Sequence, residues 1–265
     1  MNRFNFSTIL MVLLFAGCNG NEESPVPSID VQSVLNDYTT TFTKGGAVAL
    51  VQRSDGSVYS GAVGESHPGT NLSVDMSMAV GSITKNFTAV LTLKLIEEGR
   101  LHFDDNIHDI IPEWTSDKIN GNVTVKQLLG HSSGIENPLP GADGLFNRAL
   151  QNPTEEITLQ EYFEAVGEPV FEPGTQYDYS NANYMLLGLI IEKVAGTAYY
   201  THLREEILSP LQLTNTWIMN YEAPTNIIGH CWFQEESLQD LDRTAIESMG
   251  RWSGSMFSNV GDLAN

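Results

Sequence analysis

Two long helices that are apolar on nearly every face restrict the fold of this chain more than any other feature of its sequence. The first predicted helix follows Ser82 and ends near Gly99, and the second starts near Asn181 and ends at Gly196. Their apolar residues are Phe87, Val90, Leu91, Leu93, Leu95 and Ile96 in the first helix, and Tyr184, Leu186, Leu187, Leu189, Ile190 and Ile191 in the second. Helices with this pattern belong in a hydrophobic core.

The other segments predict a mixed α/β (α+β) organisation around these two helices. Helical periodicity covers about residues 29–43, and the β-rich segments 47–51 and 58–63 flank an Asp-Gly turn, which is typical of an antiparallel hairpin. Prolines and glycines divide residues 100–175 into short stretches, which predicts a loop-rich helical insert. A chain of 265 residues with 41% hydrophobic content can form one large domain with such an insert, and we place that domain at 29–265.

The first 17 residues have the features of an export signal. Arg3 precedes an apolar run, residues 4–15, that is too short to cross a hydrocarbon layer of roughly 30 Å as a helix. Small residues and Cys18 follow, and this junction resembles a bacterial lipobox, in which the cysteine is lipidated. An ordinary signal peptide cleaved at the small residues is the alternative.

The segment after the signal predicts a tether, because residues 18–28 are polar and contain two prolines. We therefore expect residues 1–17 to be a signal peptide of the lipoprotein type. The mature protein is then exported and held in the bacterial cell envelope by a lipid on Cys18, so that its expected membrane contact is this anchor.

Composition argues against several classes of function. Thirteen basic residues against 33 acidic ones give a formal charge of −20, so the surface would repel nucleic acid. The six histidines form no close pair of the His-Glu-x-x-His kind and no Cys-x-x-Cys occurs, so we expect no metal and no cofactor. Only Cys18 and Cys231 are present, and Cys231 has the apolar neighbours of a small buried hydrophobe.

The start of the first apolar helix carries a Ser-x-x-Lys sequence, Ser82 to Lys85. Residues three apart on a helix share a face, so the Lys85 amine can reach the Ser82 hydroxyl and, if desolvated, accept its proton. Unpaired N–H groups and the positive end of the helix dipole also favour a developing oxyanion at Ser82. The competing interpretation is a helix-capping serine followed by a surface lysine, because serine is a common cap.

Two further polar turns lie at helix ends. Tyr179-Ser180-Asn181 leads directly into the second apolar helix, and its alternative interpretation is a turn with a capping residue and a packed aromatic ring. Residues 128–135, with the sequence Leu-Leu-Gly-His-Ser-Ser-Gly-Ile, close a short helix. We interpret His131 in this turn as structural, because a histidine there more often bonds backbone groups of its own turn than performs acid–base chemistry.

In this order, the three segments resemble the class C β-lactamase-related family of serine hydrolases, esterases and D-amino acid peptidases. The resemblance spans about residues 45–265 and includes 186–188 and 253–258, the latter similar to the family's Gly-Gly-Leu-x-Ser segment. The Tyr-Ser-Asn form distinguishes it from class A enzymes, which carry Ser-Asp-Asn. The resemblance implies a β-lactamase/transpeptidase-like fold, an antiparallel sheet flanked by helices.

By that resemblance, Ser82 attacks a substrate carbonyl, Lys85 and Tyr179 share the proton transfers, and Asn181 orients Lys85 and binds the substrate amide. Water then releases the acyl group. Elementary chemistry agrees, because a serine hydroxyl near neutral pH needs an adjacent base, but either Lys85 or Tyr179 could be that base. The implied partner is a small-molecule or peptide substrate: a cell-wall peptide, a β-lactam, or a small ester or amide. The sequence gives no indication of oligomeric state.

One element of the family pattern is missing from this sequence. The family's third motif is a Lys- or His-initiated triplet ending in Gly on a strand near the C-terminus, and the sequence stops before any such strand. In the family that strand supplies a donor to the oxyanion hole, and loss of one donor typically costs about 10²–10³ in rate. We therefore expect a truncated form without the C-terminal strands, poorly active in isolation. The alternative function is a non-catalytic lipoprotein, a relic of the enzyme.

Overall fold

A computed structural model describes residues 30–39, 45–141, 143–226, 228–229, 232–233, 236–237 and 240–265. The predicted signal peptide, the proposed lipidation site Cys18, the tether and Cys231 lie outside these residues. Of the described helices, none combines the length and the apolar character needed to cross a lipid bilayer.

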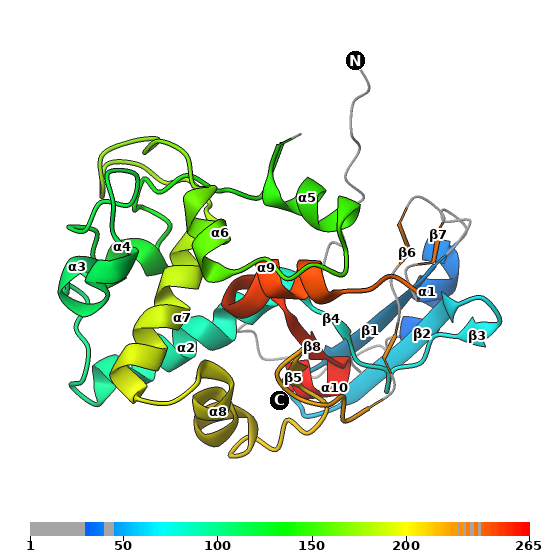
Figure 1. The fold of residues 1–265 in the computed structure, drawn as a ribbon. Coiled ribbons are helices and arrows are strands. Elements are labelled where there is room, and N and C mark those ends of the chain that lie inside the picture. The colour runs from blue at the N-terminus through cyan, green and yellow to red at the C-terminus, as the bar shows by residue number, and fades with distance from the viewer. Residues whose placement is uncertain are drawn as a thin grey trace.

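The first described elements form an antiparallel sheet with a helix against it. Strand β1 (Gly46–Gln52) pairs with β2 (Val58–His67), and β3 (Thr70–Asn71) pairs with the end of β2 after an irregularity. Helix α1 (Val31–Thr39) lies against β1 and β2. The hairpin predicted from the β-rich segments is confirmed, and Figure 1 shows it in blue and cyan on one side of the molecule.

Short helices joined by loops fill the stretch between the two long helices (Figure 1). They are α3 (Ile107–Ile110), the 3-10 turn η2 (Pro112–Trp114), α4 (Val125–Leu129), α5 (Leu145–Gln151) and α6 (Leu159–Glu164). The start of α4 is fixed by a capping box, in which Thr124 accepts from the Gln127 N–H and the Gln127 side chain accepts from the Thr124 N–H. This cap fixes the start of the short helix that leads into the polar turn containing His131.

The two long helices cross at the centre of the molecule, with α9 (Thr244–Gly254) in contact with both (Figure 1). Helix α7 (Asn181–Ala195) is buried along most of its length, as its apolar sequence predicts. Helix α2 (Thr84–Glu97) is not, because Val90 and Leu93 are 46% and 44% exposed. The expected place in the core therefore holds for Leu91 and Leu95 of α2 but not for Val90 and Leu93.

Helix α2 differs because part of its buried face is polar. The buried polar residues on that face are Thr84, Lys85, Thr88 and Thr92. Hydrophobic periodicity does not reveal such a face, since buried hydroxyl and amine groups need hydrogen-bond partners that meet them only in the folded chain. Lys85 and Thr88 find partners on α7 and α9, and Thr88 also bonds the Tyr199 hydroxyl. Thr92 donates to the Thr88 carbonyl of α2 itself.

A second small sheet joins the start of α2 to the end of α9. Strand β8 (Met256–Ser258) lies between β4 (Met78–Ala79) and β5 (Trp217–Ile218), antiparallel to both. The sequence predicts one antiparallel sheet, whereas the described residues form two sheets of three strands and one of two. The remaining elements are α8 (Tyr199–Leu203), the π-helical turn η3 (Arg204–Leu208), β6 (Trp232–Phe233), β7 (Glu236–Ser237) and α10 (Val260–Ala264).

Gly188 determines how closely α9 approaches α7. A Cβ atom at this position would lie 2.1 Å from the Trp252 ring, well inside van der Waals contact. Glycine therefore lets the buried Trp252 ring pack directly on the α7 backbone. This contact places the end of α9, including Ser253, beside the start of α2.

Candidate active site

Ser82 stands in a single 3-10 turn, η1 (Gly81–Ile83), between β4 and α2. Gly81 has a φ of 51°, a left-handed conformation that glycine adopts without strain. Thr84 Oγ1 donates to the Gly81 carbonyl at 2.7 Å and accepts from the Met256 N–H at 3.1 Å, which ties the turn to β8. The Ser82 side chain is exposed and caps neither η1 nor α2, so the interpretation of Ser82 as a capping serine is wrong.

Lys85 lies one turn further along, on the buried face of α2. Its Nζ donates to Ser82 Oγ at 3.3 Å, to Asn181 Oδ1 at 2.7 Å and to the Ser253 carbonyl at 2.7 Å. These partners come from η1, α7 and α9, and none of them carries a charge. Burial without a counter-charge disfavours the ammonium form and lowers the pKa of Lys85 to about 7.

Tyr179 lies next to both Ser82 and Lys85. Its phenol oxygen lies 2.8 Å from Ser82 Oγ, and the Lys85 amine lies 5.0 Å from the centre of its ring. Partial burial raises the pKa of Tyr179 above its ordinary value, so the phenol keeps its proton at neutral pH. The Ser82 hydroxyl therefore touches both a protonated phenol and an amine that can lose its proton near neutrality.

Asn181 is the first residue of α7 and links Lys85 to a second loop. Its Oδ1 accepts from Lys85, and its Nδ2 donates to Asn137 Oδ1 at 3.3 Å. The Asn181 backbone N–H donates to the same Asn137 oxygen at 3.4 Å. Sequence reasoning missed Asn137, which lies two residues after the polar turn that contains His131.

The carbonyl that accepts from Lys85 follows a kink in α9. Arg251 has φ 31° and ψ −118°, which interrupts the helix two residues before Ser253. Its guanidinium is anchored by donating to Glu156 Oε1 at 2.7 Å and to the Ile157 carbonyl at 3.1 Å. The kink turns the Ser253 carbonyl toward Lys85. The resemblance pointed to this segment but not to its carbonyl, because a backbone acceptor leaves no residue-type signal.

His131 lies behind Tyr179 and has a φ of 53°. Its carbonyl accepts from the Asp178 N–H at 3.0 Å, and its Nδ1 accepts from the Ser180 N–H at 3.3 Å. The sequence interpretation foresaw bonds to backbone groups of its own turn. The His131 N–H does donate to the Leu128 carbonyl of that turn at 3.3 Å, but the ring and the His131 carbonyl bond the loop that carries Tyr179.

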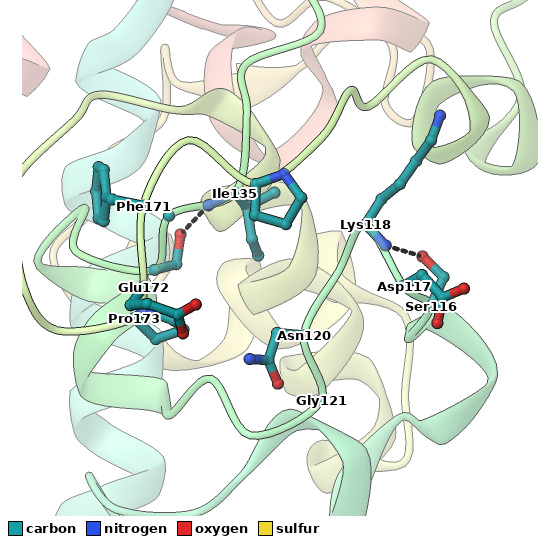
Figure 2. Close-up of a pocket in the computed structure, with 12 residues that line it drawn as sticks. Ser116, Asp117, Lys118, Asn120, Gly121, Ile135, Phe171, Glu172 and Pro173 are labelled. Carbon is teal, nitrogen blue, oxygen red and sulfur yellow. Dashed lines mark hydrogen bonds between the residues drawn. The ribbon is translucent and has the colours of Figure 1, made fainter.

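A separate hollow of about 560 Å³ is lined in part by residues 133–135 of the turn that contains His131 (Figure 2). The other lining residues lie within 116–121 and 169–173, and the lining includes none of Ser82, Lys85, Tyr179 or Asn181. The hollow is therefore separate from these four residues, which we call the serine cluster. In the described part of the chain, no three or more His, Cys, Asp or Glu side chains gather in a way that could hold a metal ion.

Comparisons with known proteins agree with this geometry. Residues 35–265 match the profile of the family described as Beta-lactamase. "Protein flp" of Staphylococcus aureus strain MW2 is 34% identical over 160 residues, which cover 57% of this chain and 30% of that protein. A "Putative D-alanyl-D-alanine carboxypeptidase" of Escherichia coli K12 is 29% identical over 264 residues, covering 90% of this chain and 58% of that protein. The chain thus spans less than two thirds of either relative.

Among solved structures, a D-stereospecific amidohydrolase from Streptomyces sp. superposes with a TM-score of 0.74 at 28% identity. The match covers 89% of this chain and 71% of the amidohydrolase. Mixed helices and antiparallel strands are therefore arranged alike in the two proteins.

Proposed function

This chain belongs to the beta-lactamase family and has its fold, and we propose that it hydrolyses an amide or ester bond through an acyl-enzyme at Ser82. One observation carries the proposal. Ser82 Oγ lies 2.8 Å from the Tyr179 phenol and 3.3 Å from the Lys85 amine, at the exposed start of a helix. A nucleophile needs such an adjacent proton acceptor near neutral pH.

The directions of the two pKa shifts support a division of roles between Lys85 and Tyr179. With a pKa of about 7, Lys85 is about half neutral at pH 7, whereas burial keeps Tyr179 protonated. Lys85 therefore accepts the Ser82 proton as Oγ attacks the substrate carbonyl. Tyr179 then donates its proton to the departing nitrogen or oxygen, and the Lys85 ammonium restores the phenol.

Deacylation runs through the same groups in reverse. Water attacks the acyl carbonyl, and its proton passes to the Lys85 and Tyr179 pair. The ester bond to Ser82 breaks, the serine oxygen regains a proton, and a carboxylic acid leaves. No group outside the cluster is needed to balance these steps.

For the substrate we propose a peptide or amide whose scissile bond follows a D-amino acid. The support comes from relatives: one similar protein is named for D-alanyl-D-alanine, and one similar structure for D-stereospecific amide hydrolysis. Cell-wall peptides contain such bonds. β-Lactams and small esters are the other acyl donors that the same nucleophile could accept.

We also propose that the protein acts outside the cytoplasm, anchored by a lipid on Cys18. The support is the sequence alone: Arg3, the apolar run 4–15 and the small residues before the cysteine. Metabolic labelling with a palmitate analogue should mark the wild-type chain and leave Cys18→Ala unmarked. Equal labelling of both would remove the anchor from the proposal.

The test of the reaction is labelling of the full chain with a fluorescent penicillin and a fluorophosphonate. We expect a labelled band with the wild type, none with Ser82→Ala, and an unchanged band with Ser209→Ala, which alters an exposed serine beyond α8. Labelling that survives Ser82→Ala would contradict Ser82 as the nucleophile, and a wild type that no probe labels would favour a non-catalytic lipoprotein.

Substrate class is then tested with matched pairs that differ only in stereochemistry. Peptides ending in D-Ala-D-Ala and amides of D-amino acids should be cleaved, and their L-counterparts should not. Equal cleavage of both, or cleavage of β-lactams and esters alone, would overturn the D-amide assignment while leaving the acyl-enzyme intact.

A further inference from the structure

His131 forms hydrogen bonds to the loop that carries Tyr179, on both sides of that residue. Its carbonyl accepts from the N–H of Asp178, and its ring Nδ1 accepts from the N–H of Ser180. Asp178 and Ser180 are the immediate neighbours of Tyr179. One residue therefore fixes the backbone directly before and directly after the phenol that touches Ser82.

The imidazole ring also lies against the Tyr179 ring. The two ring centres are 4.5 Å apart and the planes are inclined by 32°. Tyr184 of α7 lies near the same imidazole, at 5.2 Å and 34°. These contacts restrict the swing of the Tyr179 side chain, so His131 sets ring orientation as well as backbone position.

Hydrogen bonds determine which nitrogen of His131 carries the proton. Ser133 Oγ donates to Asn183 Oδ1 at 2.6 Å, which leaves the Asn183 Nδ2 group as the donor toward His131 Nδ1 at 3.2 Å. Nδ1 thus faces two N–H donors and accepts from both, so the proton resides on Nε2.

The neutral form of the ring is favoured by its surroundings. Burial, and then the charge of Lys85, lower the pKa of His131 to about 4, although the charge of Asp178 opposes the shift. A protonated ring would turn an N–H at Nδ1 against two other donors. The ring therefore stays neutral over the pH range in which a base at Lys85 would work.

We propose that His131 is a positioning residue for Tyr179. The hydrogen bonds of His131 to both neighbouring amides, and its contact with the Tyr179 ring, keep the phenol oxygen within hydrogen-bond distance of Ser82. The proposal rests on the proposed function, but it concerns a geometry that can be observed without turnover.

The first readout is spectroscopic. Tyrosine labelled with ¹³C at the phenol carbon gives a Tyr179 resonance, identified by its loss in Tyr179→Phe. In the wild type, Ser82→Ala should shift this resonance, because it removes the 2.8 Å contact. In a His131→Ala background the same Ser82→Ala change should leave it nearly unmoved, since the phenol has already left its place.

The second readout is the rate of acylation by the fluorophosphonate. His131→Ala removes the ring and the acceptor, and we expect a loss of about 10²-fold, the size associated with a misplacement of about 1 Å. His131→Asn tolerates a left-handed φ and places an oxygen where Nδ1 stood, so it should recover part of the loss, to about 10-fold.

The matched controls are His202→Ala and His202→Asn. His202 is also buried, it lies in α8, and its Nε2 has no hydrogen-bond partner among the described residues. Both His202 variants should keep the Ser82-dependent Tyr179 shift and acylate within about 3-fold of the wild type at equal folded fraction. Equal losses at the two histidines would show a general packing effect and overturn the proposal.

If Ser82→Ala shifts the Tyr179 resonance in the His131→Ala background as much as in the wild type, the proposal is overturned, whatever the acylation rates. If His131→Ala does not fold, the pair His131→Asn and His202→Asn decides by the same criteria. A wild type that shows the Tyr179 shift but no acylation would contradict the proposed function alone and leave the positioning role standing.

Discussion

The two ends of the serine cluster are built differently. At one end, Lys85 is buried and donates to three neutral acceptors supplied by three separate elements. At the other end, Ser82 is exposed and Tyr179 is about one third exposed, and a hydrogen bond between their side chains joins them. The proton acceptor is fixed within the core, while the nucleophile and its second partner face solvent.

This difference separates two properties that a serine hydrolase must control. The proton affinity of Lys85 depends on burial, which the packing of α2, α7 and α9 maintains. The position of the Tyr179 phenol depends on a loop held by His131. Changes at the lysine end should therefore alter protonation, and changes at the tyrosine end should alter geometry.

Replacing the amine should give the largest effect. In Lys85→Arg the side chain stays charged at any accessible pH and cannot accept the Ser82 proton, so acylation should fall by about 10²–10⁴-fold. The control is Lys94→Arg, on the exposed side of the same helix, where Lys94 pairs with Glu206 at 3.3 Å. Fluorophosphonate labelling rates measure both. Substantial labelling of Lys85→Arg would mean that Tyr179 is the base.

Acidification should have the next largest effect. Lys85 accepts a proton only in its neutral form, which predominates above its pKa of about 7. The acylation rate should therefore fall about tenfold for each pH unit below 7, or about 10²-fold at pH 5, and level off above 8. Stopped-flow labelling between pH 5 and 9, with circular dichroism to verify folding, measures it. A flat profile across this range would contradict the buried-amine assignment.

A smaller effect should follow from disturbing the helix contact that buries the lysine end. Gly188→Ala forces the Trp252 ring away and should cost about 1–3 kcal/mol in the free energy of unfolding. Gly254→Ala is the control, because a Cβ there meets no atom within 4 Å. Urea denaturation compares the two variants. Equal stability of both would show that the α7 and α9 contact is not tight.

The sequence predicted the elements whose signals are local. The hairpin and the long helix α7 followed from periodicity and turn residues, and the resemblance brought Ser82, Lys85, Tyr179 and Asn181 into one site. The structure connects these four side chains in a series of hydrogen bonds that runs from Tyr179 through Ser82 and Lys85 to Asn181. Their catalytic roles remain predictions for the experiments above.

What escaped prediction depends on loops that meet only in three dimensions. Asn137 and His131 contact the start of α7 across more than forty residues of sequence, and no local pattern indicates that meeting. The exposed Val90 and Leu93 of α2 were also missed, because periodicity shows which residues share a face but not whether another element covers it.

The acceptor that Ser253 offers to Lys85 is a peptide carbonyl, and this determines which mutations can remove the contact. No codon change at position 253 can delete that oxygen, because every amino acid carries one. Mutation can reach it only indirectly, by relaxing the left-handed turn at Arg251 or the anchors that hold it. Loss of this contact should therefore map genetically to residues that never touch the lysine.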